Sequence, residues 1–126
     1  MAASQTFSPG DAHKDQSAGE FIAKMAAEIK EWLHDNTRSG VDVGRRWVLT
    51  AVLPNGTELV IHQLSAHGHS VIKLRGELID GRPGLLISHL HSVQFLASYI
   101  PRAAKEPEKR EIGFHTGIGK EIKIEQ

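Results

Sequence analysis

Two closely spaced histidine pairs are the residues of this 126-residue sequence whose types and spacing could carry chemistry: His67 with His69, and His89 with His91. In a locally extended backbone, residues two apart point to the same side, so each pair can present its imidazoles together. A protonated imidazole donates to phosphate and stacks on a base, whereas a neutral imidazole ligates Zn, Ni or Cu. The pairs therefore indicate a nucleic-acid contact or a metal site, with solvated turn residues as a third interpretation.

The sequence lacks the motifs and the further ligands that usually accompany histidines in a catalytic site or a metal centre. A catalytic zinc site has three protein ligands oriented by carboxylates, and the nearby Glu58, Glu77 and Asp80 are not obviously placed to do this. The chain has no cysteine, and it has no His-Glu-x-x-His, Gly-x-Ser-x-Gly, Gly-x-Gly-x-x-Gly or Gly-Lys-Ser/Thr motif. We expect a protein that is not an enzyme and has no cofactor or physiological metal. A His-rich metal-binding domain is an alternative.

Composition and charge are typical of one soluble domain. The chain has 15 Lys+Arg, 15 Asp+Glu and 40% hydrophobic residues, and its length allows a single modest core. A formal net charge of zero argues against nucleic-acid binding through a broad positive field. No apolar run approaches the roughly 18 residues of a membrane span, and residues 1–15 contain none long enough for a signal peptide. We therefore expect a cytoplasmic protein with no membrane partner.

The elements that must position the histidines begin with one helix. Residues 1–16 show no periodicity and are expected to form a flexible N-terminal arm. Ser17 and Glu20 form a capping box, which predicts a helix over residues 18–34. Its apolar stripe recurs at steps of three and four residues and consists of Phe21, Ile22, Met25, Ile29, Trp32 and Leu33.

Residues 44–101 change to apolar and β-branched runs of strand length separated by turn residues. Asn55-Gly56 is a strong hairpin signal, and no helical segments separate the runs, which favours antiparallel pairing. The expected strands span residues 47–53, 57–66, 70–78, 85–88 and 93–100. The predicted fold class is mainly β with an N-terminal α-helix: a small, bent five-stranded antiparallel sheet or barrel within residues 17–101. Residues 102–126 are expected to form a charged tail, in which Ile118, Ile122 and Ile124 permit a late edge strand.

An open five-stranded sheet leaves two edge strands unpaired. The apolar runs at residues 85–87 and 93–96 are nearly unbroken, which predicts burial on both faces. We expect a homo-oligomer that pairs these edges between subunits. The alternative is a monomer whose helix and tail cover the same surface.

The helix and five strands resemble the Sm-like family of Sm, LSm and bacterial Hfq proteins. Leu53-Pro54-Asn55-Gly56 looks like the turn between the first two strands of that family, and Leu59 falls at its aliphatic position. Val71, Ile72 and Leu74 fall in its third strand. Other motif positions differ, since Ile61 replaces a Gly and His89-Leu90-His91 replaces the second motif.

The resemblance implies a ring of six or seven subunits whose pore is lined by the loops that carry the two histidine pairs. It implies a non-catalytic protein that binds single-stranded RNA with weak sequence preference. The expected RNA-binding residues are His67, His69, His89, His91, Lys73 and Arg75, and further phosphate contacts are Arg45, Arg46, Arg82 and Arg102. The alternative is an Sm-like scaffold or protein-interaction module that binds no RNA.

Overall fold

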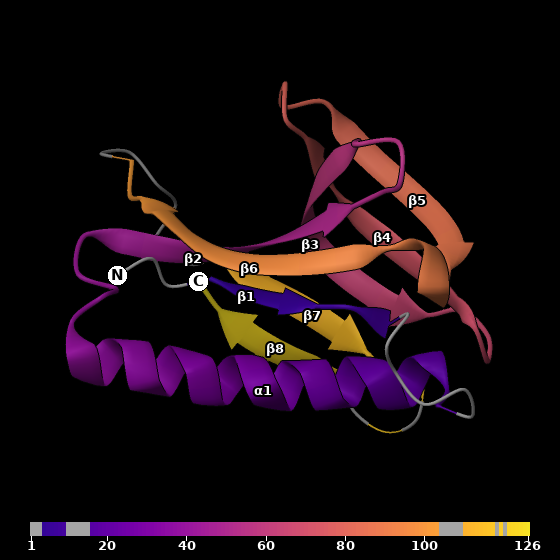
Figure 1. Ribbon diagram of the computed structural model, residues 1–126, viewed down its shortest axis with the longest axis horizontal. Helices are drawn as coiled ribbons and strands as arrows, with labels where there is room; N and C mark the ends of the chain where they lie inside the picture. The colour runs from indigo at the N-terminus through magenta and orange to yellow at the C-terminus, as the bar shows by residue number, and fades with distance from the viewer. Residues whose placement is uncertain (1–3, 10–15, 104–109, 118, 120) are drawn as a thin grey trace.

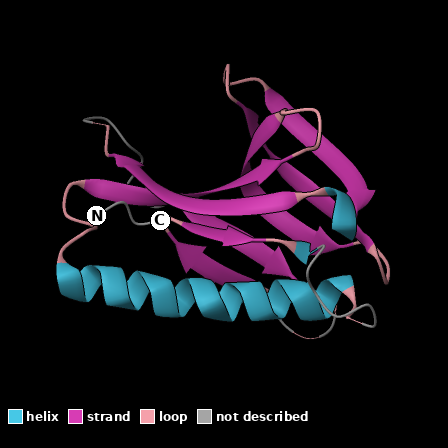
Figure 2. Cartoon of the chain, in the orientation of Figure 1, coloured by secondary structure: helices cyan, strands magenta, loops and turns pink. Residues whose placement is uncertain are grey.

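The computed structural model describes residues 4–9, 16–103, 110–117, 119 and 121–126. One helix lies along a curled sheet that contains eight strands (Figures 1 and 2). The strands are β1 (Gln5–Phe7), β2 (Arg45–Val52), β3 (Glu58–Ala66), β4 (Val71–Leu78), β5 (Pro83–His89), β6 (Gln94–Pro101), β7 (Glu111–His115) and β8 (Ile122–Glu125). The mainly β architecture with one helix is as the sequence predicts. The five expected strands correspond to β2–β6, and β8 lies where the sequence permits a late edge strand, whereas β1 and β7 were not predicted.

The helix α1 (Ala18–Ser39) begins where the capping box predicts, because the Ser17 side chain accepts a hydrogen bond from the Glu20 N–H at 3.1 Å. It continues five residues beyond the expected end at residue 34 and stops at Gly40, which adopts a left-handed conformation with φ of 79°. The Val41 N–H then bonds to the Asn36 carbonyl at 3.0 Å. No helix in the described part of the chain is long and apolar enough to cross a membrane.

The sheet has the strand order β1-β6-β2-β3-β4-β5, with every neighbouring pair antiparallel. The strand β3 changes partners along its outer edge. Its first residues, Glu58–Val60, pair with β2, whereas Gln63–Ser65 pair in parallel with β7. The change occurs at a bulge that places His62 between the two registers. A bulge bends its strand. Beyond the bend, the part of the sheet that contains β4 and β5 rises away from α1 (Figure 1).

The core lies between α1 and the concave side of the sheet. The apolar stripe of α1 is buried from Phe21 to Ile29, and the rings of Phe21 and Phe95 lie 5.8 Å apart. Trp47 is 2% exposed, and its indole N–H donates to the Glu125 carbonyl at 2.7 Å. This bond joins the start of β2 to the last residues of the chain.

The ends of the chain differ from the sequence expectation. Within the expected flexible arm, β1 pairs with β6 and buries Phe7; residues 1–3 and 10–15 lie outside the described residues. Within the expected tail, β7 and β8 bury Ile112, Phe114 and Ile124. The late edge strand at Ile122 and Ile124 is present as β8, whereas Ile118 is outside the described residues. The strands β1 and β7 escaped prediction because their pairing partners, β6 and β3, are distant in the sequence.

Gly76 is required at the bend of β4. A Cβ at this position would collide with the Val60 carbonyl oxygen across the bulge. A Cβ at Gly84 would meet side chains alone, the terminal Cδ1 of Leu59 at 2.8 Å and Leu78 Cγ at 3.8 Å. We expect Gly76→Ala to lower the free energy of unfolding by about 1–3 kcal/mol or more, because a backbone must move. Urea unfolding measures this loss. Gly84→Ala is the matched control with a smaller loss, and equal losses would contradict the role of the close approach.

The Tyr99 hydroxyl is buried beside α1, where its ring lies 5.1 Å from that of Trp32. Burial raises the pKa of Tyr99, the Asn36 amide lowers it, and the Asp42 carboxylate raises it further. Neither the hydroxyl nor Asn36 Nδ2 makes a hydrogen bond of good geometry. Because the folded protein holds this proton more tightly, Tyr99 contributes to the free energy of unfolding, and this contribution is fully present below the pKa of unfolded tyrosine. It is lost as pH rises through the higher folded pKa.

The chain contains one tyrosine, so phenolate absorbance reports Tyr99 alone. We expect it to titrate above the usual tyrosine range in the folded protein, and to return to that range in urea. The alkaline loss of stability should be smaller in Tyr99→Phe. Identical titrations in the folded and unfolded protein would contradict this prediction.

Candidate functional site

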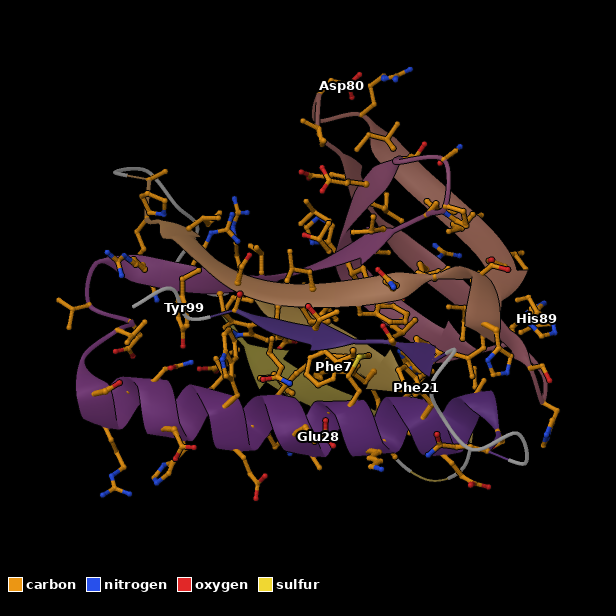
Figure 3. The ribbon with its side chains drawn as sticks, viewed as in Figure 1. Phe7, Phe21, Glu28, Asp80, His89 and Tyr99 are labelled. Carbon is orange, nitrogen blue, oxygen red and sulfur yellow. The ribbon has the colours of Figure 1, made fainter. Side chains whose placement is uncertain are left out.

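The two histidine pairs lie at one end of the sheet, beside the N-terminus of α1. Val71, the first residue of β4, pairs with His89, the last residue of β5. The Leu90 N–H donates to the Ser70 carbonyl at 2.7 Å, and the Ala18 N–H donates to the His69 carbonyl at 2.6 Å. The turn 67–70 and the end of β5 are therefore neighbours. Figure 3 shows His89 at the end of the molecule where α1 begins.

The four histidines are all exposed but differ in their contacts. The rings of His89 and His91 lie 5.5 Å apart. His91 belongs to a short 3-10 turn, Leu90–Ser92, and its Nδ1 lies 3.1 Å from the Pro9 carbonyl oxygen. A carbonyl oxygen only accepts, so this bond requires a proton on His91 Nδ1. His91 thus holds the segment after β1, and His89 is the freer of the two rings.

A metal site is not assembled among the described residues. They contain no group of three or more His, Cys, Asp or Glu side chains placed to hold an ion. The histidine pairs share one end of the molecule, yet within the described chain no carboxylate completes a ligand set around them.

A continuous row of side chains extends from the histidine end along the outer side of β4 and β5. Lys73 pairs with Ile87 and Arg75 with Leu85 across the two strands. Because side chains alternate along a strand, these residues share one side with His89, while Ile72 and Leu74 are buried on the other. Glu77, which pairs with Pro83, lies on the same side. We use the name β4–β5 face for five residues of this side: Lys73, Arg75, Leu85, Ile87 and His89.

The expected two-sided burial of residues 85–87 is wrong. Leu85 is 60% exposed and Ile87 is 53% exposed, whereas Leu86 between them packs against the core. The β5 run contains apolar residues on both sides, so periodicity cannot distinguish a buried side from an exposed one. The run at residues 93–96 is also buried mainly on one side, because Val93 and Phe95 are buried whereas Gln94 is exposed and Leu96 is half-buried.

The β4–β5 face carries an excess of positive charge. In the described chain, neither Lys73 nor Arg75 makes an ion pair or a side-chain hydrogen bond. The Glu77 carboxylate on the same side of β4 lies 3.4 Å from His62 Nε2, and the Asp80 carboxylate in the adjoining turn lies 2.7 Å from Arg82 Nε. Two cations therefore stand free beside exposed apolar side chains.

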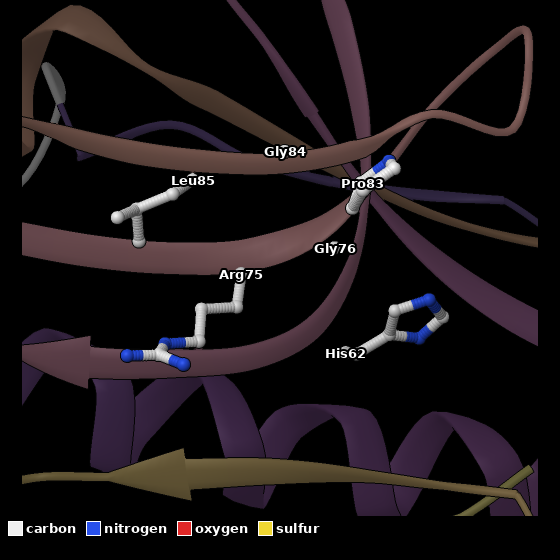
Figure 4. Close-up of a pocket in the computed structure, with 6 residues that line it drawn as sticks. All are labelled: His62, Arg75, Gly76, Pro83, Gly84 and Leu85. Carbon is white, nitrogen blue, oxygen red and sulfur yellow. The ribbon is translucent and has the colours of Figure 1, made fainter.

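A hollow of about 410 Å³ continues this face at the bulge. Its floor is formed where the backbones of Gly76 and Gly84 pair, and Arg75 and Leu85 stand on one side (Figure 4). His62 and Pro83 stand on the other side. Nothing in the sequence pattern of β3 marks His62 for this place, because a bulge shifts the alternation only once the strand is paired.

The further arginines that the sequence nominates do not join this face. Arg45 and Pro101 pair at the opposite end of the β2–β6 ladder. The Arg45 guanidinium donates to the Val41 carbonyl at 3.3 Å, and that of Arg102 donates to the Gln126 carbonyl at 3.2 Å. Arg46 follows Arg45 in β2. Arg82 lies in the β4–β5 turn, paired with Asp80.

Comparison of the chain with protein-family models, curated proteins and solved structures finds no match.

The bond between His91 and Pro9 is testable. We expect His91→Ala to lower the free energy of unfolding by about 1 kcal/mol, because a partly buried hydrogen bond is lost. Amide exchange at Gln5–Phe7 should also become faster, since the segment after β1 loses its anchor. The control is His67→Ala, an exposed turn residue. Unchanged exchange in β1 would contradict the proposed anchor.

Proposed function

We propose that this protein is a non-catalytic, Sm-like protein that binds single-stranded RNA with weak sequence preference across the β4–β5 face. The observation that carries the proposal is the pair of free cations, Lys73 and Arg75, in one row with the exposed side chains of Leu85, Ile87 and His89. The proposed fold family rests on the order of one helix followed by the five antiparallel strands β2–β6.

The chemistry of the face suits a single strand. Lysine and arginine neutralise phosphates, while imidazole and apolar side chains pack against the faces of unstacked bases without choosing among them. A formal net charge of zero is compatible with this arrangement because the positive charge is local. His67 and His69, in the adjoining turn, would extend the same path beyond His89.

The test replaces both cations with neutral residues, Lys73→Gln together with Arg75→Gln. The matched control, Lys24→Gln with Lys30→Gln, removes the same charge from the exposed side of α1. Fluorescence anisotropy with uridine-rich and adenosine-rich oligonucleotides at low salt is the measurement. We expect the first variant to bind roughly tenfold more weakly. Its salt dependence should decrease in slope by about 1.4, for two lost phosphate contacts on a single strand.

Equal affinity in the two double variants would contradict the placement of RNA on this face. Failure of the unmodified protein to bind either oligonucleotide at low salt and high micromolar concentration would overturn the proposed function itself.

A protein-interaction module without RNA binding is the second candidate. The exposure of Leu85 and Ile87 favours it, because apolar side chains on an edge strand are a docking feature. Salt separates the two candidates: phosphate contacts weaken steeply as salt rises, whereas an apolar contact does not.

A further inference from the structure

The strand β5 is an open edge of the sheet. In the described residues it pairs with β4 alone, and no strand lies beyond it in Figure 1. The opposite edge of the sheet is partly covered, because β1 pairs with β6 at Phe95–Ala97. The strand β8 is also terminal, but Lys123 and Glu125 make it charged. Among these edges, β5 combines length with an apolar sequence.

The direction of the free backbone groups follows from the ends of the β4–β5 ladder. The Leu78 N–H bonds to the Arg82 carbonyl, and the Leu90 N–H bonds to the Ser70 carbonyl. Hydrogen bonding alternates along an antiparallel ladder, so the even-numbered residues of β5 face β4. The N–H and C=O groups of Leu85, Ile87 and His89 therefore point outward, together with the carbonyl of Pro83.

Natural edge strands are protected by charges, bulges, proline or coverage, since free backbone groups attract another strand. The sequence of β5, Pro-Gly-Leu-Leu-Ile-Ser-His, contains no Lys, Arg, Asp or Glu, and its ladder with β4 contains no bulge. Pro83 is the first residue of β5, and its backbone nitrogen points away from β4. The N–H that proline lacks therefore removes no hydrogen bond to β4. The edge is thus open to pairing from Pro83 to His89.

We propose that β5 pairs antiparallel with β5 of a second copy of this chain, about a two-fold axis that passes beside Leu86. A strand centred on Leu86 is complementary to itself. Leu85 faces the partner's Ile87, Ile87 faces the partner's Leu85, and Pro83 faces the partner's His89. Each outward N–H then meets an outward carbonyl, which gives about six hydrogen bonds between the subunits. No like charges oppose each other in this register.

The side chains support the same register. Leu85 and Ile87 are large apolar residues that remain mostly exposed in one chain, and directly opposed side chains lie about 5 Å apart in such a ladder. Pairing around the two-fold axis brings the two apolar pairs together at the centre of one surface. Lys73 and Arg75 of each copy flank that centre, on β4, so the two β4–β5 faces become continuous. The dimer does not depend on RNA binding. It takes the place of the ring that the family resemblance implies, because β1 covers part of the β6 edge that a ring would pair with β5.

Two double variants test the register with a matched design. In the first, Leu85→Lys with Ile87→Lys, each introduced lysine directly opposes an introduced lysine of the second copy. We expect this variant to be a monomer. Leu85→Lys with Ile87→Glu introduces the same polarity but opposes unlike charges, and we expect the dimer to persist. Analytical ultracentrifugation of the unmodified protein and both variants is the measurement. A monomer of the unmodified protein at high micromolar concentration, or dimers of both variants, would overturn the proposal.

Amide exchange of the unmodified protein supplies an independent readout if both variants are monomeric. Dilution should speed exchange at Leu85, Ile87 and His89, whose N–H groups face the partner. Exchange at Leu86 and Ser88, which face β4, should change much less. A dimer in which all five amides respond alike would overturn the β5 register. RNA binding that fails while this pattern is present would reject the proposed function alone.

Discussion

The close approach of β3 and β4 at the bulge is the constraint on which the rest of the molecule depends. Gly76 lies against the Val60 carbonyl, so β4 can follow β3 past His62 without a side chain between them. The bulge frees the other edge of β3 to exchange β2 for β7. This exchange brings the last described strands, β7 and β8, under the sheet beside α1, where Ile112 and Phe114 complete the core.

The same bend separates two kinds of surface. The sheet near α1 is closed by the helix and by β1, whereas the end of the β3-β4-β5 portion extends away from the helix (Figure 1). One side of β4 and β5 still contributes Leu74 to the core, and the other carries the half-buried Lys73 and the exposed Arg75. An exposed face and an open backbone edge thus occur together on β5. Both proposals use this strand: RNA would contact the side chains on its exposed side, and a second copy would bond to the backbone groups of its free edge and pack against Leu85 and Ile87.

The sequence predicted correctly those features that depend on residues close together in the chain. Ser17 and Glu20 are three residues apart and cap α1 as expected, and Asn55-Gly56 lies in the turn between β2 and β3. The end of α1 depended on which of several helix-breaking residues adopts a left-handed conformation, and Gly40 does so. The histidine pairs were recognisable as neighbours in sequence. Their meeting at one end of the sheet, however, depends on the pairing of Val71 with His89.

By itself the sequence determined the helix, its buried stripe and the five central strands, because capping, turn chemistry and periodicity act over a few residues. Only the tertiary structure decided that Leu85 and Ile87 are exposed, since an apolar run carries no record of which side meets the core. It also decided that β1 and β7 form, because these short strands obtain their hydrogen bonds from the distant strands β6 and β3. The placement of His62 in a bulge is of the same kind, because β3 acquires a bulge only in register with β4.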